Sequence, residues 1–116
     1  MKLKDKIAIV TGGSRGIGYA IVEAFLKEGA TVILTASSHA NAEKAVEKLK
    51  AAHPDASVMG ISPELTSLES VRSAFRDVAD KFGRIDILVN NAGVSERTLL
   101  NDYTEELFEK VMDLNV

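Results

Sequence analysis

The 116-residue sequence contains no cysteine and no tryptophan, and only 5% of its residues are aromatic. Without cysteine the chain can form neither a disulfide framework nor a thiolate metal site, and it has no cysteine nucleophile. Its formal net charge is −3, so it offers no basic field to nucleic acid or to an anionic membrane. We expect neither of these as a partner, and the sequence predicts no metal site.

The N-terminus also lacks a long apolar segment. Residues 1–6 are mostly charged, and only four apolar residues, Ile7 to Val10, precede Thr11. A signal peptide needs a longer apolar region, and a membrane span needs about 18 apolar residues in a row. We therefore expect a cytoplasmic protein that does not enter a membrane.

What the sequence does contain is a short apolar run that ends in glycines. The run from Ile7 to Val10 is typical of a parallel strand that is covered on both faces. After the glycines, apolar residues recur at helical spacing, which predicts a helix beginning near Gly16. The predicted apolar face of that helix consists of Ile17, Ala20, Ile21, Ala24 and Phe25.

The turn between this strand and this helix contains Gly12, Gly16 and Gly18. Free backbone N–H groups and the positive end of the helix dipole would point at this loop and attract an anion. The glycines would allow a tight turn, close approach of a phosphate and close packing of the helix on the sheet. A dinucleotide pyrophosphate is the expected ligand, and a structural turn without a ligand is the alternative.

The same loop also matches Gly-x-Ser-x-Gly, the nucleophile elbow of hydrolases, with Ser14 as the nucleophile. A hydrolase would need an acid and a histidine later in the chain. The two histidines, His39 and His53, come early, before one helix and at the end of another. We therefore favour the dinucleotide site.

The rest of the chain alternates apolar strands with amphipathic helices. Further strands are predicted at residues 30–35, 56–61 and 85–89. Helices are predicted from the polar segment 37–41 to His53, from a capping box at Thr66 and Glu69 to a stop at Gly83, and from a second capping box at Asp102 and Glu105 to the chain end.

This alternation predicts an α/β fold, a Rossmann-like, doubly wound parallel sheet in three α/β/α layers, truncated after the fourth strand and the start of the following helix. Residues 1–116 would form one incomplete domain with strand order 3-2-1-4. The loop after the first strand would then face residues 90–93 after the fourth strand, at the topological switch point where ligands bind.

Both loops resemble those of the short-chain dehydrogenase/reductase family. Residues 11–18 fit Thr-Gly-x-x-x-Gly-x-Gly, and residues 90–93 read Asn-Asn-Ala-Gly. The resemblance extends over essentially all 116 residues and implies an NAD(P)(H)-dependent oxidoreductase that interconverts a secondary alcohol and a ketone. Pro54 and residues 62–67 and 112–116 look like the bacterial branch with bile-acid 3α-hydroxysteroid dehydrogenases and 3-oxoacyl-carrier-protein reductases.

The resemblance also implies which residues would bind the dinucleotide. Glu64-Leu65-Thr66 stands where the family usually has Asp-Leu-Thr, whose carboxylate touches the adenine amine. The predicted cofactor-binding residues are Gly12, Ser14, Arg15, Gly16, Ile17, Gly18, Ser37, Ser38, Glu64, Leu65, Asn91, Ala92 and Gly93.

The position that selects between NAD and NADP is Ser37. A carboxylate there would bind the ribose 2′-hydroxyl and repel a 2′-phosphate, but Ser37 and Ser38 are neutral. Arg15 is placed to meet a 2′-phosphate with its guanidinium group. We therefore prefer NADP and keep NAD as possible; the two serines can also be a cap for the helix that follows.

The catalytic residues implied by the family are mostly absent. Asp113-Leu114-Asn115-Val116 resembles the segment whose Asn holds a water in the proton path, which makes Asn115 the catalytic candidate. Tyr19 and Tyr103 are not followed by Lys four residues later, so no Tyr-x-x-x-Lys is present. The sequence thus predicts the N-terminal, cofactor-binding half of an enzyme that is expected to be a homo-oligomer, and this half alone should not turn over substrate.

A stand-alone nucleotide-binding module is the alternative to this half-enzyme. In such a module the fourth strand, Ile85 to Val89, would have an open edge that could pair with another chain.

Overall fold

The computed structural model describes residues 2–64 and 67–91. In this part of the chain four strands alternate with three helices, as the apolar periodicity predicts. The elements are β1 (Ile7–Val10), α1 (Gly16–Lys27), β2 (Thr31–Thr35), α2 (His39–Ala52), β3 (Val58–Ile61), α3 (Leu68–Phe82) and β4 (Ile87–Val89). The helix predicted after Asp102 lies outside the described residues.

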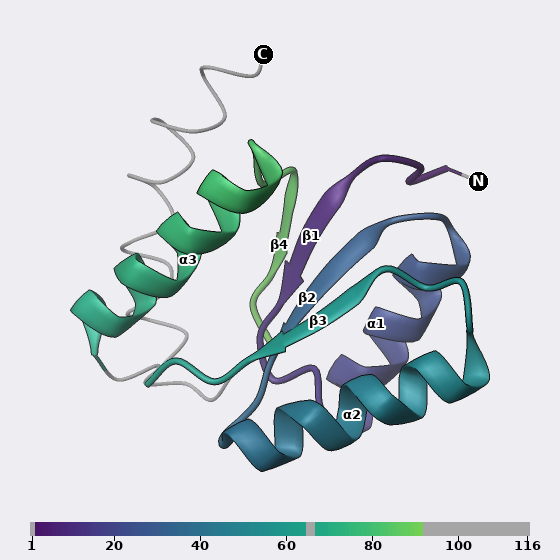
Figure 1. The fold of residues 1–116 in the computed structure, drawn as a ribbon, viewed down its shortest axis with the longest axis horizontal. Coiled ribbons are helices and arrows are strands. Elements are labelled where there is room, and N and C mark those ends of the chain that lie inside the picture. Colours follow the sequence, from purple (N-terminus) through teal and green to yellow (C-terminus); the bar gives the residue numbers. More distant parts are fainter. Residues whose placement is uncertain (1, 65–66, 92–116) are drawn as a thin grey trace.

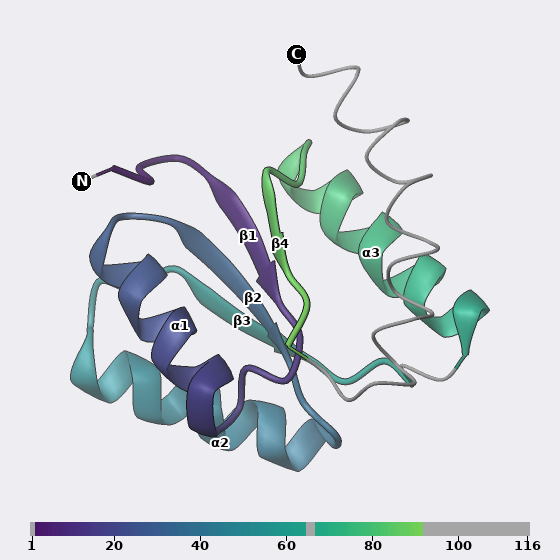
Figure 2. The ribbon, with the colours of Figure 1, turned by 180° about the vertical axis from the view of Figure 1, so that it is seen from behind.

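The four strands form one parallel sheet in the order β3-β2-β1-β4, which confirms the predicted order. Helices α1 and α2 cover one face of the sheet and α3 covers the other (Figures 1 and 2). The register pairs Ala8 of β1 with Val32 of β2 and with Ile87 of β4. The fold is therefore Rossmann-like, with a layer of helices on each side of the sheet.

Each face of the sheet has its own hydrophobic core, because successive side chains of a strand point to opposite faces. Ala8 and Val10 pack with Val22 of α1 and Leu49 of α2. On the opposite face, Ile7 and Ile9 belong to the core that includes Val71, Phe75 and Val78 of α3. All four residues of β1 are buried, which explains why this strand is a continuous apolar run.

The predicted apolar face of α1 is only partly correct: Ile21 and Phe25 are half-buried and pack against the core, but the other three residues do not. Ile17 is 74% exposed, Ala20 and Ala24 are exposed as well, and the buried positions are Gly18, Val22 and Leu26. The helix packs on the sheet through Val22 and Leu26, and at Gly18 the missing side chain lets its backbone approach the carbonyl of Gly12 in the loop. The buried face is therefore rotated by about 100° around the helix axis from the predicted face, which corresponds to a shift of one residue along the sequence.

The predicted helix boundaries are close to those observed, with one correction. The N-cap of α3 is Ser67, whose Oγ accepts a hydrogen bond from the N–H of Ser70, so the cap lies one residue after the predicted Thr66. Gly83 ends α3 with φ of +82°, a left-handed conformation that favours glycine. Strand β1 has the predicted bounds, and β2, β3 and β4 begin one or two residues later than predicted, although Ala30 and Ile85 are buried.

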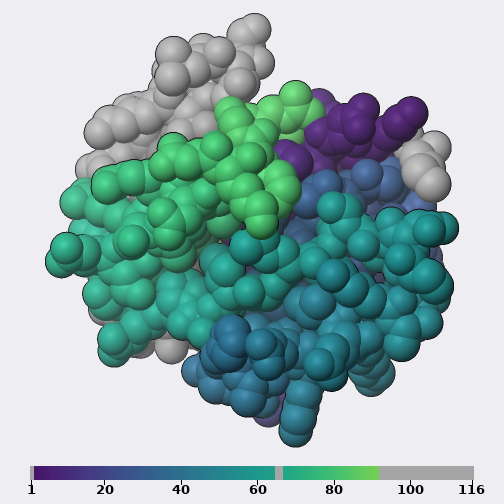
Figure 3. All heavy atoms as spheres, viewed as in Figure 1, coloured from purple at the N-terminus to yellow at the C-terminus, as the bar shows by residue number. Residues whose placement is uncertain are grey.

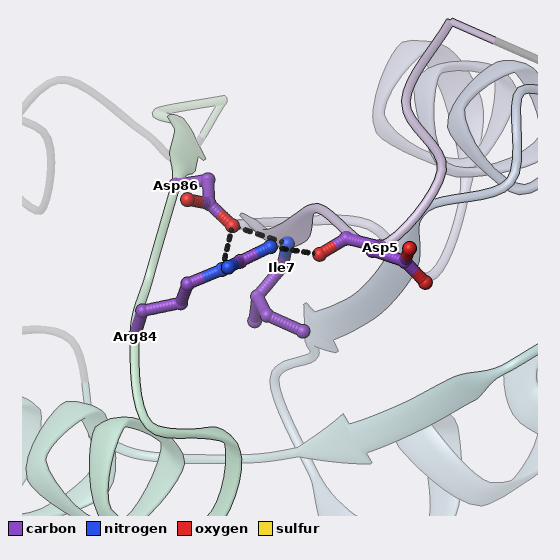
Figure 4. Close-up of polar contacts among 4 residues, drawn as sticks. All are labelled: Asp5, Ile7, Arg84 and Asp86. Carbon is purple, nitrogen blue, oxygen red and sulfur yellow. Dashed lines mark hydrogen bonds and ion pairs between the residues drawn. The ribbon is translucent and has the colours of Figure 1, made fainter. Parts of the chain in front are cut away.

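At the amino ends of β1 and β4, a polar cluster fixes the two strands side by side (Figure 4). One carboxylate oxygen of Asp86, Oδ2, accepts hydrogen bonds from the backbone N–H of Ile7 at 2.8 Å and from Nε of Arg84 at 2.9 Å. Arg84 also donates to the backbone carbonyl of Asp5, and the N–H of Asp86 donates to the carbonyl of Ile7. These bonds bring β4 alongside β1 in the observed register.

Removing the Asp86 carboxylate should destabilise the fold. Asp86→Ala leaves the N–H of Ile7 without its partner and should lower the free energy of unfolding by about 1–3 kcal/mol, measured by urea denaturation. Asp86→Asn keeps an acceptor for that N–H and should lose less. The control Asp55→Ala removes an exposed carboxylate and should change little; equal losses in Asp86→Ala and Asp55→Ala would contradict the assigned role.

Candidate dinucleotide site

The predicted loops meet at the carboxyl edge of the sheet. Residues 11–15 follow β1, and Asn90 and Asn91 follow its parallel neighbour β4. In Figure 1 this edge lies away from the N-terminus. The space-filling view likewise places the start of α2, in blue, and the N-terminal residues, in purple, at opposite ends of the molecule (Figure 3). The site therefore lies at the sheet edge far from the Asp86 cluster.

Thr11 joins the two loops. It is fully buried, its backbone N–H donates to the carbonyl of Val89 at 3.0 Å, and its Oγ1 accepts from the N–H of Asn91 at 2.8 Å. Thr11 Oγ1 lies 3.3 Å from the carbonyl oxygen of Val89 and 3.4 Å from Oδ1 of Asn90, and its hydroxyl can donate to either oxygen. The side chain thus ties the glycine loop to the first residues after β4.

Thr35, the last residue of β2, holds the same loop from the other side. Its Oγ1 accepts from the N–H of Gly12 at 3.0 Å, and its carbonyl accepts from the N–H of Gly13 at 3.0 Å. Gly13 is itself tightly enclosed, since a Cβ built there would lie 2.8 Å from Cβ of Leu34. Sequence analysis did not single out Thr35 or Gly13; the available signal was a threonine at the end of an apolar strand.

The glycines of the predicted motif have separate structural roles. Gly12 and Gly16 have φ of +66° and +61°, which favours glycine. A Cβ at Gly18 would lie well inside the van der Waals distance of the Gly12 carbonyl oxygen and 2.7 Å from Nδ2 of Asn91. A Cβ at Gly16 would meet nothing within 4 Å. Gly18 is therefore needed for packing, whereas Gly16 borders open space at the start of α1.

The N-terminus of α1 differs from those of the other described helices. Arg15 is its N-cap residue and makes no side-chain cap hydrogen bond. By contrast, Ser38 caps α2 and Ser67 caps α3. Within the described part of the chain no side chain accepts from the first N–H groups of α1, an environment that suits an anion.

The residues after β2 lie beside this loop, because Thr35 is bonded to it. Ser38 Oγ accepts from the backbone N–H of Asn41 at 3.1 Å and caps α2, which confirms the cap considered from the sequence. Ser37 Oγ accepts from Nδ2 of Asn41, also at 3.1 Å. Both serines are exposed, and Asn41, which the sequence analysis did not select, contacts the two of them.

The remaining predicted residues are only partly described. Glu64 is exposed at the end of the segment after β3, and its backbone N–H donates to Ser70 Oγ at 2.9 Å. Ser14 is half-buried in the glycine loop, and Arg15 is exposed. Four predicted residues, Leu65, Ala92, Gly93 and Asn115, lie outside the described part of the chain.

The polar contacts do not support a hydrolase triad at Ser14. His39 Nε2 pairs with Glu43 at 2.8 Å, and His53 Nε2 pairs with Glu23 at 3.1 Å. Within residues 2–64 and 67–91, neither histidine bonds to Ser14. The hydrolase interpretation therefore has no base among the described residues.

Tyr19 lies on α1 and is half-buried, with Lys48 Nζ 5.1 Å from its ring centroid. Burial, and secondly the negative charge of Glu23, raise the pKa of Tyr19 above its usual value of 10.0. A tyrosine that transfers protons near neutral pH needs the opposite shift, and the Tyr19 side chain packs against the core beneath α1.

The described residues give no sign of a second kind of site. No group of three His, Asp or Glu side chains gathers among them as metal ligands would. None of the described helices is long and apolar enough to cross a membrane. A hollow of about 440 Å³ between β3 and α3 includes Met59 and Ile61 but none of the predicted cofactor residues.

A parallel sheet with helices on both faces and a glycine loop at its switch point defines a Rossmann-like dinucleotide-binding class of fold. The family model for short chain dehydrogenase matches residues 6–116. The chain therefore belongs to the short-chain dehydrogenase family, as the resemblance of the two loops indicated.

Two curated relatives match the predicted bacterial branch. A 3alpha-hydroxysteroid dehydrogenase of Mediterraneibacter gnavus is 47% identical over 116 residues, which is 100% of this chain and 46% of that protein. A 3-oxoacyl-[acyl-carrier-protein] reductase of Vibrio cholerae is 39% identical over the same length, again 46% of the relative. The chain thus spans about half the length of these relatives.

Solved structures support the same family. A metagenomic short-chain oxidoreductase in complex with NADP superimposes with a TM-score of 0.74 and 34% identity, covering 81% of this chain and 42% of that one. The NADPH-dependent reductase YwfH, involved in bacilysin biosynthesis, gives a TM-score of 0.72 with 28% identity, covering 76% of this chain and 37% of the other. The chain is therefore similar to these two proteins in fold as well as in sequence.

Adding one methyl group at Gly18 should disrupt the contact between the loops. In Gly18→Ala the new Cβ collides with the Gly12 carbonyl and with Asn91, so we expect a loss of at least about 2 kcal/mol of stability by urea unfolding. The control Ala20→Gly changes an exposed position of the same helix and should cost only about 1 kcal/mol. A Gly18→Ala protein as stable as the wild type would show that the two loops are not in contact.

Proposed function

We propose that this chain is the N-terminal, cofactor-binding half of an oxidoreductase that uses NADP in preference to NAD and interconverts a secondary alcohol and a ketone. The observation that supports this most directly is the N-terminus of α1, which lacks a side-chain cap and borders the open space at Gly16. An anionic diphosphate fits this environment, because its oxygens would accept hydrogen bonds from N–H groups that no side chain satisfies.

The residues of this chain would bind and orient the dinucleotide. The backbone of residues 12–18 would hold the diphosphate, and Thr11 would keep this loop against Asn91. Arg15, Ser37 and Ser38 would contact the adenosine ribose, and the exposed carboxylate of Glu64 would accept from the adenine amine. Leu65, Ala92 and Gly93 complete the proposed site. When bound, the nicotinamide supplies or accepts a hydride.

Proton transfer would depend on residues that are mostly outside these 116 positions. We propose Asn115 as the residue that holds a water in the proton path, and the Ser and Tyr-x-x-x-Lys of the family would follow in the remainder of a longer protein. The substrate pocket would be formed there as well. We further propose a homo-oligomer located in the cytoplasm, as expected from the composition and the family.

A stand-alone nucleotide-binding module is the second candidate. It is favoured by the fold of the described residues, in which sheet, loop and helix already form two packed cores. The intact mass of the natural protein distinguishes the two: a species near 12.5 kDa is the module, and a species about twice as large is the enzyme.

A larger side chain at Gly16 should block the dinucleotide. Gly16→Val places a branched side chain in the open space at the helix start, so NADP affinity measured by calorimetry should fall below detection. The matched control is Gly83→Val, because Gly83 also has positive φ and open surroundings but lies at the end of α3. Both variants should lose about 1–3 kcal/mol of stability from backbone strain. Unchanged NADP affinity in Gly16→Val would exclude the loop from the site.

The choice between nucleotides can be tested at the ribose end. Arg15→Ala with Ser37→Asp removes a cation and adds a carboxylate, so NADP should lose at least tenfold more affinity than NAD in calorimetric titrations. The single variant Arg15→Ala should give a smaller difference in the same direction. Equal losses for NADP and NAD in the double variant would contradict the preference for NADP.

A further inference from the structure

Asn41 contacts both serines of the proposed ribose end. Its side-chain Nδ2 donates to Ser37 Oγ, and its backbone N–H donates to Ser38 Oγ, each at 3.1 Å. Ser37 follows Thr35 by two residues, and Thr35 is hydrogen-bonded to Gly12 and Gly13. The side chain of Asn41 therefore holds the hydroxyl of Ser37, and its backbone N–H holds that of Ser38, two and three residues after the strand end that is bonded to the glycine loop.

These two contacts determine what the hydroxyls can offer to a ligand. A serine hydroxyl has one proton to donate and two lone pairs that accept. In both serines Asn41 occupies a lone pair, and neither hydroxyl donates its proton to another atom of the described chain. Both hydroxyls are exposed, so their protons are available to a bound ligand.

We propose that Asn41 is a positioning residue whose side-chain amide orients the hydroxyl of Ser37 as a hydrogen-bond donor, beside the capping hydroxyl of Ser38, and thereby favours a 2′-phosphate over a 2′-hydroxyl. This inference rests on the proposed dinucleotide site. A phosphate dianion only accepts hydrogen bonds, so two hydroxyl donors and the guanidinium of Arg15 match it. A ribose 2′-hydroxyl is recognised best by a carboxylate acceptor, which this part of the chain does not offer at position 37.

Two substitutions at position 41 separate the hydrogen bond from the fold of α2. Asn41→Ala removes the donor to Ser37 but keeps the backbone N–H that Ser38 caps, so α2 should remain folded. Asn41→Asp replaces the donor with an acceptor that would take the proton of Ser37, and its charge is compatible with the first turn of a helix. The matched control is Ala40→Asp, which adds the same charge to the same exposed turn and keeps Asn41.

The readout is the ratio of the dissociation constants for 5′-AMP and for adenosine 2′,5′-bisphosphate, measured by calorimetry on the intact protein. Loss of one hydrogen bond should lower this preference for the 2′-phosphate about three- to tenfold in Asn41→Ala. We expect a larger decrease in Asn41→Asp and a smaller one in Ala40→Asp. Thermal unfolding of each variant checks that the fold is retained.

Three results would overturn the inference. The first is an unchanged ratio in Asn41→Ala, and the second is an equal decrease in Ala40→Asp and Asn41→Asp, which would make charge alone sufficient. In both cases the wild type still binds the two probes, so the proposed function stands. The third is a wild-type protein that binds neither probe, which removes the proposed function together with the inference.

Discussion

The parallel pairing of β1 with β4 is the constraint on which the candidate site depends. It brings the carboxyl ends of two strands that are nearly 80 positions apart in the chain to the same edge, and the buried hydroxyl of Thr11 then joins the loops that follow them. Without this contact, the glycine loop and Asn91 would not face each other, and the start of α1 would lose its contact with Asn91. The pairing is supported by apolar packing on both faces of β1.

The sequence was sufficient to predict the strands and helices to within one or two residues, because these depend on local patterns, and the strand order followed from the usual crossovers between alternating strands and helices. Continuous apolar runs mark strands that are covered on both faces, and Gly83 marks the end of α3 through its left-handed conformation. The apolar face of α1 was predicted only in part. A pattern of apolar residues gives no weight to Gly18, yet Gly18 is where the helix backbone meets the loop, and this contact sets which side chains turn inward.

The candidate site shows a similar division. The glycine loop, Arg15 and Asn91 could be selected because motif spacing places them next to a strand end. Thr35 and Asn41 could not, since their importance comes from hydrogen bonds to Gly12 and to Ser37, which depend on how β2 and α2 are placed in three dimensions. A residue that acts by hydrogen-bonding another residue is difficult to recognise from motif spacing alone.

The Asp86 cluster lies at the amino ends of β1 and β4, and the proposed ribose-binding residues follow the carboxyl end of β2. The bonds that align β4 with β1 therefore share no atoms with the side chains proposed to distinguish one nucleotide from another. Substitutions around Ser37 can consequently alter ligand choice while the alignment of the strands stays intact. A fold arranged in this way can diversify its cofactor use within a family without rebuilding its core.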